Sequence, residues 1–282
     1  MRILITGAAG FIGSSLYDAL EEEHVVFGFD NFLTGKNRAN RLLQLDIAER
    51  AALYRVANEF EPELVIHCAA SYKDPDKWHL DTQTNVMGAI NVAAVARHHS
   101  ARVIYFQTVL PPISSYAISK IAAEHYLRLS GVPLTVFRLA AVYGPRNLSG
   151  AIPTFYRQVS AGKPCTVVED ATRDFVFIED LVALASFYSR QEYFAPGVMD
   201  VRTGVETPIR HIPHLIGEIL DIAPIVNLVP RRDDDVAAYD MTGAPRGGTL
   251  FVEGLRKTVE WYERHPVTDT FTHLRLGAEN AG

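Results

Sequence analysis

The chain has 282 residues, of which 48% are hydrophobic and 21% charged, as is ordinary for a globular protein with a sizeable core. Its formal charge of −6 argues against nucleic acid or an anionic membrane surface as the main partner, because binding to these requires a basic excess. Cys68 and Cys165 form no CxxC pair, so we expect neither a disulfide framework nor a metal site. A strand-like run begins at Arg2, and no apolar stretch approaches the roughly eighteen residues that cross a bilayer, so we expect a cytoplasmic protein.

The first half of the chain alternates short apolar runs with amphipathic helical patterns. The predicted strands are 3–6, 25–29, 42–45, 64–67, 103–106 and 134–137. The predicted helices between them are 11–22, 48–59, 81–98 and 116–129. Because near-continuous apolar strands separated by helices form parallel sheets covered on both faces, this pattern predicts an α/β protein with a doubly wound Rossmann sheet.

After Gly150 the rhythm changes to helices separated by shorter strands and loops. The predicted helices lie near 152–161, 178–190, 208–220 and 252–264. We therefore expect a Rossmann domain over 1–150, to which 175–202 returns. The segments 151–174 and 203–282 are expected to form a smaller α/β carboxyl-terminal region that binds substrate.

A glycine-rich turn follows the first predicted strand and opens the first predicted helix. It carries Gly7, Gly10 and Gly13, with Phe11 and Ile12 between the last two. Glycines at these positions permit a tight turn, close approach of the backbone to a pyrophosphate and close packing of helix on strand. A glycine triplet alone is weak support, but its position between strand and helix predicts a dinucleotide site.

An acidic residue, Asp30, ends the second predicted strand, where a carboxylate can accept hydrogen bonds from the adenosine ribose hydroxyls. The same carboxylate repels a 2′-phosphate, so NAD is favoured over NADP. Asp46, after the third strand, is a candidate adenine contact or a turn-forming residue. Ala69 and Ala70 are small enough for the chain to pass close to the dinucleotide.

Tyr116 and Lys120 are four residues apart at the start of a predicted helix and therefore share one helical face. A lysine charge stabilises tyrosinate and lowers the tyrosine pKa, which makes the phenol usable as a general base near neutrality. YxxxK often occurs by chance, but here Thr108 ends the strand that precedes the helix. Together the three residues predict a redox site beside the dinucleotide.

These motifs resemble those of the extended short-chain dehydrogenase/reductase family, and within it the NAD-dependent epimerase/dehydratase group that includes UDP-glucose 4-epimerase. The resemblance covers essentially the whole chain and also includes His67–Ala70, Thr84–Val86, Val142–Arg146, Arg173–Val176 and Pro230–Arg232. It implies that Tyr116 is the acid/base, that Lys120 also holds the nicotinamide ribose, and that Thr108 hydrogen-bonds the reacting hydroxyl. Thr108 as a plain strand residue stays an alternative. The expected cofactor contacts are Gly7, Gly10, Phe11, Ile12, Gly13, Asp30, Asn31, Asp46, Ile47, Ala69, Ala70 and Lys120.

Two arginines match positions where the family grips the pyrophosphate of a sugar nucleotide, namely Arg173 and Arg232. Arginine suits this role because its guanidinium fork pairs two phosphate oxygens at once, although surface ion pairs are the alternative. Asp235 and Tyr239 fall where the family lines the nucleotide and hexose pocket. The resemblance also implies a homodimer built from the helices near 81–98 and 116–129.

Val109 and Leu110 follow Thr108, where related dehydratases and decarboxylases place an extra acid. The residues therefore favour a 4-epimerase that oxidises a nucleotide-sugar carbinol to a 4-keto sugar and returns hydride to its other face. Two departures from the family pattern bear on the substrate. Tyr116 lies only eight positions after Thr108, where the family usually has a much longer loop. Ala141 stands where the family commonly has a substrate-binding asparagine.

Two other functions fit parts of this pattern. The shortened loop would suit a one-way NAD(P)-dependent ketoreductase or dehydrogenase of a modified sugar or secondary metabolite. The fold would also suit a dinucleotide-sensing regulatory protein. Such a sensor can dispense with catalytic side chains, so the intact pair of Tyr116 and Lys120 argues against it.

Overall fold

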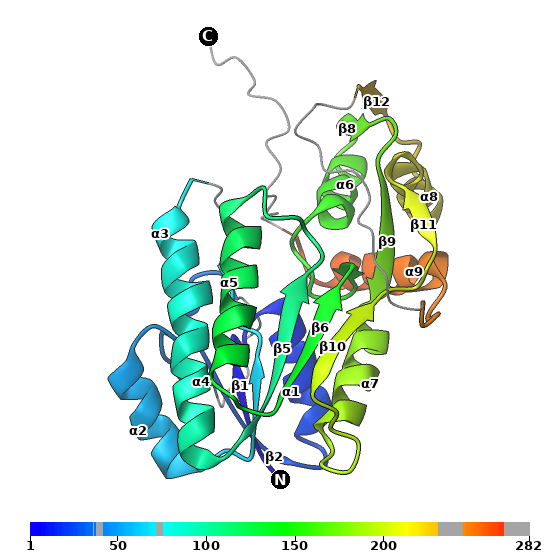
Figure 1. Cartoon of the computed structure of the whole chain (residues 1–282). Helices are drawn as coiled ribbons and strands as arrows, with labels where there is room; N and C mark the ends of the chain where they lie inside the picture. Colours follow the sequence, from blue (N-terminus) through cyan, green and yellow to red (C-terminus); the bar gives the residue numbers. More distant parts are fainter. Residues whose placement is uncertain (36, 38–41, 72–75, 231–244, 268–282) are drawn as a thin grey trace.

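The computed structural model describes residues 1–35, 37, 42–71, 76–230 and 245–267. Its centre is a seven-stranded parallel sheet in the order β10-β6-β5-β4-β1-β2-β3 (Figure 1). The sheet confirms the predicted doubly wound fold, and its strand order reverses between β1 and β4. In such sheets ligands bind at the carboxyl ends of the strands beside this reversal. The strands are β1 (Arg2–Thr6), β2 (Val25–Asp30), β3 (Leu43–Gln44), β4 (Leu64–His67), β5 (Arg102–Thr108), β6 (Leu134–Leu139) and β10 (Gly197–Val201).

The central strands are apolar along their whole length because both faces of the sheet are covered. In β1, Ile3 and Ile5 pack into one hydrophobic core, whereas Leu4 between them packs into the other. The alternation follows from the two-residue period of a strand. Helices α1 (Phe11–Leu20) and α7 (Ile178–Ser189) cover the first face, and α2 (Arg50–Phe60), α4 (Gly88–His99) and α5 (Ser115–Leu129) cover the second.

The predicted helix 81–98 is longer and less regular than expected. It consists of α3 (Trp78–Asp81), a π-helical segment over Thr82–Met87, and α4, in direct succession. The π-helical segment carries Asn85, whose buried side chain hydrogen-bonds Ser71 and Ser119 rather than solvent. A hydrophobic periodicity cannot reveal such a segment, because its wider turn is tied to contacts with distant parts of the chain.

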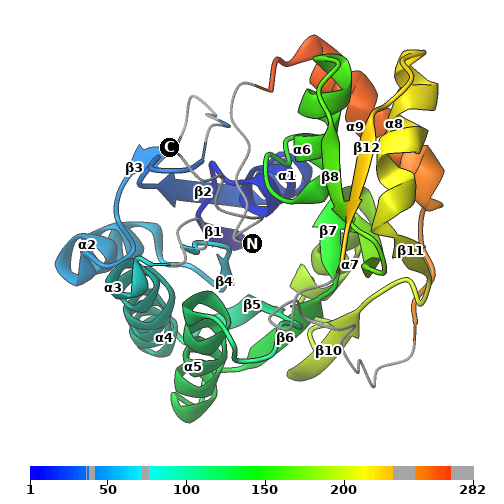
Figure 2. The ribbon, with the colours of Figure 1, turned by 90° about the horizontal axis from the view of Figure 1, so that it is seen from above.

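The carboxyl-terminal half builds a smaller layer above the carboxyl ends of the central strands (Figures 1 and 2). One small sheet contains β7 (Ala141–Tyr143), β9 (Thr172–Phe177) and β11 (Glu206–Pro208), and another pairs β8 (Cys165–Val168) with β12 (Val226–Val229). The helices are α6 (Ala151–Ser160), α8 (Ile212–Leu220) with a 3-10 turn over Ile209–His211 before it, and α9 (Phe251–Arg264).

The chain returns to the central sheet through β10, which pairs with β6, while α7 packs beside α1. That the segment 175–202 belongs to the Rossmann domain stays a prediction. The division into domains at residue 150 stays a prediction. Within the residues described, no helix has both the length and the apolar character needed to cross a bilayer.

Candidate active site

A large cleft of about 2390 Å³ runs across the carboxyl ends of the central strands. Typical pockets for one small ligand measure roughly 300–1,000 Å³, so this cleft has room for a dinucleotide and a second ligand. Its lining includes the glycine turn, the ends of β4 and β5, the start of α5, and residues of α6, β8 and β9. It therefore lies between the Rossmann sheet and the smaller layer.

Two glycines of this turn, Gly7 and Gly13, stand where a side chain would not fit. Gly7 has a φ of +67°, and a Cβ atom built on it would lie 2.5 Å from the backbone nitrogen of Ala69. A Cβ atom on Gly13 would collide with the carbonyl oxygen of Gly7, and Gly10 is the N-cap of α1. Free backbone N–H groups at the start of this helix, together with its dipole, suit a phosphate. The cradle therefore fits the pyrophosphate of a dinucleotide.

Asp30 is buried at the end of β2 beside this turn. Its carboxylate accepts hydrogen bonds from the backbone N–H groups of Ala9 (3.0 Å) and Phe32 (2.8 Å). Burial raises the pKa of Asp30, although these hydrogen bonds oppose the shift. The carboxylate is thus held in one orientation facing the cleft, where it can accept ribose hydroxyl groups.

Asp46, unlike the other predicted cofactor residues, does not line the cleft. Its carboxylate accepts hydrogen bonds from the Ala48 N–H (2.9 Å) and the Asn31 side chain (3.0 Å), as a turn-forming aspartate does. Asn31 and Ile47, on either side of this contact, line the cleft. A direct contact of Asp46 with adenine stays a prediction. The remaining cofactor candidates line the cleft: Gly7, Gly10, Phe11, Ile12, Gly13, Ala69, Ala70 and Lys120.

Thr108, Tyr116 and Lys120 line the same cleft from β5 and α5. Ser114 begins α5 by accepting a hydrogen bond from the Ala117 N–H (3.2 Å), which places Tyr116 in the first helical turn. The Thr108 hydroxyl oxygen accepts a hydrogen bond from the Leu110 N–H (3.1 Å). The fold thus brings together the three residues that the sequence predicts as catalytic.

Lys120 is buried, and burial lowers its pKa to about 7. The amine therefore gives up its proton more readily than that of an exposed lysine. A neighbouring tyrosinate favours the ammonium form, just as the ammonium favours tyrosinate. This mutual dependence suits a pair that must hold and release a proton near neutrality.

A buried network around Asn85 supports the start of α5, and the sequence reasoning did not single it out. The Asn85 side chain donates to the Ser71 carbonyl (2.9 Å) and to the Ser119 hydroxyl (2.8 Å), and Ser119 in turn donates to the Tyr116 carbonyl (2.8 Å). The network joins the loop after β4, the π-helical segment and α5. In the sequence, the run Thr84–Val86 matched the family pattern, but the pattern alone assigned it no role.

Arg173 lies on β9, in the wall of the cleft formed by the smaller layer. Its guanidinium donates to the carbonyl of the adjacent Thr172 (2.7 Å), and within the described residues it forms no ion pair. The neighbouring Asp174 faces away and holds Thr203 and Gly204. Arg232, Asp235 and Tyr239 lie outside the described residues.

Comparisons with known proteins agree with this geometry. Residues 3–199 match the model of the NAD dependent epimerase/dehydratase family. The chain belongs to this family. Its cofactor is accordingly NAD, and the glycine cradle and buried Asp30 fit that group. The family assignment confirms the resemblance drawn from the glycine turn and the Tyr116 and Lys120 pair.

Individual family members show how similar the chain is to proteins of known name. A crystal structure of the Bordetella bronchiseptica enzyme WbmG in complex with NAD and UDP is 34% identical and has a TM-score of 0.87, covering 97% of this chain and 98% of that one. The UDP-glucose 4-epimerase of Mycolicibacterium smegmatis is 30% identical over 93% of this chain and 98% of its own length. A dTDP-glucose 4,6-dehydratase of Neisseria meningitidis is 26% identical, with 93% of both chains covered. The family therefore includes more than one reaction on nucleotide sugars.

Proposed function

We propose that this protein is an NAD-dependent nucleotide-sugar 4-epimerase that acts on substrates of the UDP-hexose type. One observation carries the proposal: Thr108, Tyr116 and Lys120 share a cleft with the glycine cradle, and Arg173 lies in that cleft on the smaller layer. A sugar held between the two layers would have its diphosphate near an arginine and its carbinol near an acid/base. The UDP present in the WbmG crystal structure is consistent with this class of ligand.

Each catalytic side chain has a defined role in this proposal. Tyr116 as tyrosinate takes the proton from the C4 hydroxyl and later returns it, while Lys120 stabilises the tyrosinate and binds the nicotinamide ribose. Thr108 orients the C4 oxygen by a hydrogen bond. NAD, when bound, supplies the acceptor and donor of hydride at C4. The backbone of the glycine turn and the Asp30 carboxylate hold its pyrophosphate and adenosine ribose.

Epimerisation needs one acid/base, whereas loss of water or carbon dioxide needs further proton transfer. Val109 and Leu110 follow Thr108 and line the cleft with apolar side chains. Neither can carry a proton. This favours a 4-epimerase over the dehydratase reaction that some relatives catalyse.

The loop from 109 to 114 and Ala141 favour a second candidate, a one-way ketoreductase or dehydrogenase of a modified sugar. The loop is short and Ala141 lines the cleft without a polar group, so a less polar substrate than a hexose could be held there. Purified protein distinguishes the two. We expect NAD to remain bound through purification and UDP-glucose to interconvert with UDP-galactose without added cofactor. Stoichiometric consumption of added NADH or NADPH would instead establish the reductase.

Arg173 should contribute to substrate binding more than to the chemical step. We expect Arg173→Ala to raise the KM for a UDP-hexose by about ten- to a hundredfold with kcat changed only a few-fold, because charge-assisted hydrogen bonds to phosphate are lost. Steady-state kinetics measure both constants. Arg210→Ala is the matched control, because Arg210 is exposed and does not line the cleft. Equal effects of the two substitutions would contradict the role of Arg173.

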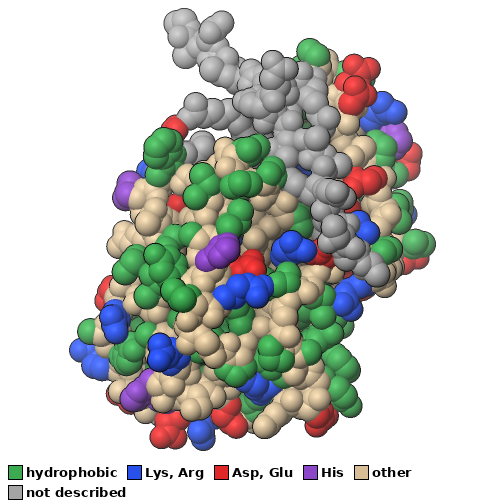
Figure 3. Space-filling model, in the orientation of Figure 1, with side chains coloured by type: hydrophobic (Ala, Val, Ile, Leu, Met, Phe, Trp, Pro, Cys, Tyr) green, Lys and Arg blue, Asp and Glu red, His purple; other side chains and the backbone are tan. Residues whose placement is uncertain are grey.

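We also propose a homodimer through the helices over 78–99 and 115–129. Large apolar side chains are exposed there, and Figure 3 shows hydrophobic side chains over this side of the molecule. Leu129 is 81% exposed, Trp78 67%, Ile118 53% and Met87 46%. Apolar area of this extent on two neighbouring helices is typical of a protein interface.

The double substitution Met87→Glu and Leu129→Glu is expected to convert the dimer to a monomer, because buried unpaired carboxylates are costly. Size-exclusion chromatography with light scattering measures the mass. Val205→Glu is the control, because Val205 is also largely exposed but lies between β10 and β11. A monomeric parent protein, or a dimer that tolerates both glutamates, would refute this interface.

A further inference from the structure

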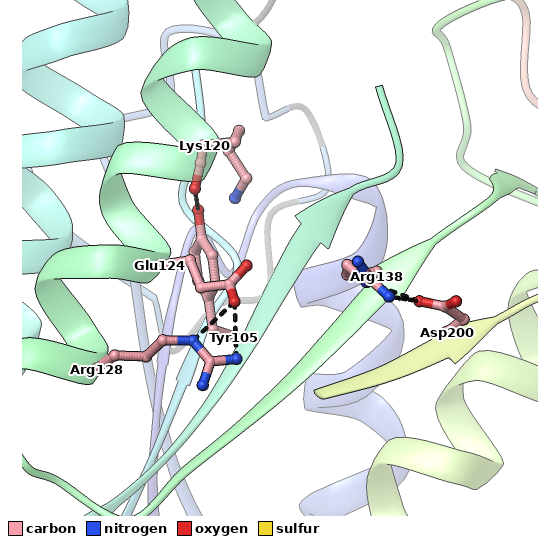
Figure 4. A network of polar contacts seen from close by, with 6 residues as sticks. All are labelled: Tyr105, Lys120, Glu124, Arg128, Arg138 and Asp200. Atoms are coloured by element: carbon pink, nitrogen blue, oxygen red, sulfur yellow. Dashed lines mark hydrogen bonds and ion pairs between the residues drawn. The ribbon is translucent and has the colours of Figure 1, made fainter. Parts of the chain in front are cut away.

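Among the residues that the structure describes, the buried ammonium group of Lys120 has no carboxylate partner. Within the described residues it forms no ion pair, and the nearest acid along its helix is Glu124, one turn away. Glu124 instead accepts hydrogen bonds from Arg128, with both nitrogen–oxygen distances at 2.8 Å (Figure 4). A buried cation normally requires compensation, so another group must supply it.

The ring of Tyr105 lies next to this ammonium. The Lys120 Nζ atom is 4.1 Å from the ring centroid, and the ring is fully buried on β5 (Figure 4). The Tyr105 hydroxyl donates a hydrogen bond to the Lys120 backbone carbonyl (3.1 Å), so one side chain contacts both ends of the lysine. Burial raises the Tyr105 pKa well above its ordinary value, which keeps this hydroxyl protonated and able to donate.

His67, on the neighbouring strand β4, also contacts the Tyr105 ring. The two rings stack with centroids 5.6 Å apart, and the His67 Nδ1 atom is hydrogen-bonded to the Thr6 hydroxyl (2.7 Å). Burial, with a smaller contribution from the Lys120 charge, lowers the pKa of His67 to about 3, so the imidazole is neutral. It therefore fixes the ring without adding a competing positive charge.

We infer that the face of the Tyr105 ring is the group that balances the Lys120 charge, and that Tyr105 and His67 are positioning residues for it. A ring quadrupole attracts a desolvated cation placed over its face. Unlike a carboxylate, the ring cannot accept the proton or swing into an ion pair that would draw Lys120 away from Tyr116. The contribution of this arrangement to catalysis rests on the proposed function, but the contact itself does not.

The other titratable groups around Lys120 do not replace the ring. Cys68, after β4, has a pKa raised by burial and is a neutral thiol, and Tyr116 is the group that Lys120 serves. Asp81 on α3 accepts a hydrogen bond from Ser71 (2.8 Å). On β6, Arg138 is paired with Asp200, with a nitrogen–oxygen distance of 2.6 Å (Figure 4).

The experiment is an NMR titration of the Lys120 amine in protein labelled with [ε-13C]lysine, with Lys120→Met used to assign the signal. The variants at position 105 are Tyr105→Phe, Tyr105→Leu, and phenylalanine carrying two or five ring fluorines. Fluorine withdraws charge from the ring face and keeps its shape. Because the titration needs no turnover, its outcome is independent of whether the enzyme proves to be an epimerase.

We expect Tyr105→Phe to leave the Lys120 pKa within a few tenths of a unit, and Tyr105→Leu to lower it by about one unit. The fluorinated variants should lower it stepwise, most with five fluorines. That series decides the matter even where Tyr105→Leu fails to fold, because the ring still fills its site. A pKa that is unchanged across the fluorinated series, or equally shifted by Phe and Leu, overturns the inference.

Discussion

Replacing Tyr116 with phenylalanine is expected to lower the rate of UDP-hexose interconversion by about 10²- to 10⁴-fold and to leave NAD bound. The phenol is the proposed acid/base, and phenylalanine keeps its ring but cannot carry a proton. The NAD site should be unaffected, because the glycine cradle and Asp30 lie on β1, α1 and β2, away from this hydroxyl. Coupled assay of product and mass spectrometry of the bound cofactor measure the two effects separately.

Tyr126→Phe is the matched control for this experiment. Tyr126 lies on the same helix and loses the same hydroxyl, but it is 45% exposed and does not line the cleft. It should retain full activity. If Tyr116→Phe were as active as the parent protein, the proposed chemistry would be wrong. Should cellular function also survive, the sensor hypothesis would be favoured instead.

Gly7→Ala is expected to abolish NAD binding and to lower the free energy of unfolding by roughly 2 to 5 kcal/mol. Two effects add at this position. The left-handed φ of +67° is costly for any residue with a Cβ atom, and that atom would lie 2.5 Å from the Ala69 nitrogen. Because the Ala69 nitrogen is a backbone atom just after β4, this collision can be relieved only by moving the strand ends that form the cleft.

Gly162→Ala separates these two effects. Gly162 has a similar φ of +62°, but a Cβ atom there meets nothing within 4 Å. Gly162→Ala should lower the free energy of unfolding by only about 1 kcal/mol, because the left-handed backbone conformation is unfavourable for alanine. It should leave NAD binding unchanged. Thermal or denaturant unfolding with calorimetric titration of NAD measures both quantities. Similar losses in the two variants would mean that close packing of the turn is not what makes Gly7 necessary.

We expect the reaction to depend on a few residues near the substrate, because the fold is common to relatives with different reactions. Relatives that are named as epimerase and as dehydratase both cover nearly the whole chain, so the fold does not separate them. The residues after Thr108 and the wall around Ala141 are where this protein departs from the common pattern. Substrate panels should therefore vary the substituents on the sugar as well as the nucleotide.

Much of the fold and the NAD site followed from local sequence. The strands could be told from the helices because strands of a parallel sheet buried on both faces are apolar along their whole length, whereas the helices are amphipathic. The glycine turn could be recognised because its glycines stand where a Cβ atom does not fit. That Thr108, Tyr116 and Lys120 line one cleft also followed from a strand end and a four-residue helical spacing, whereas their catalytic roles stay predictions. These features depend on residues close together in the chain.

The tertiary structure alone decided how those residues are supported. Asn85 reaches Ser119 from a π-helical segment, Asp46 turns toward Asn31, and Lys120 lies on the ring of Tyr105 and, among the described residues, not against an acid. Each contact joins separate elements, and hydrophobic periodicity gives the face on which a side chain lies but not which side chain of another element it meets. The glycine turn predicts the cofactor and the spacing of Tyr116 and Lys120 leads to the proposed acid/base, but how the buried lysine is balanced depends on packing between β4, β5 and α5.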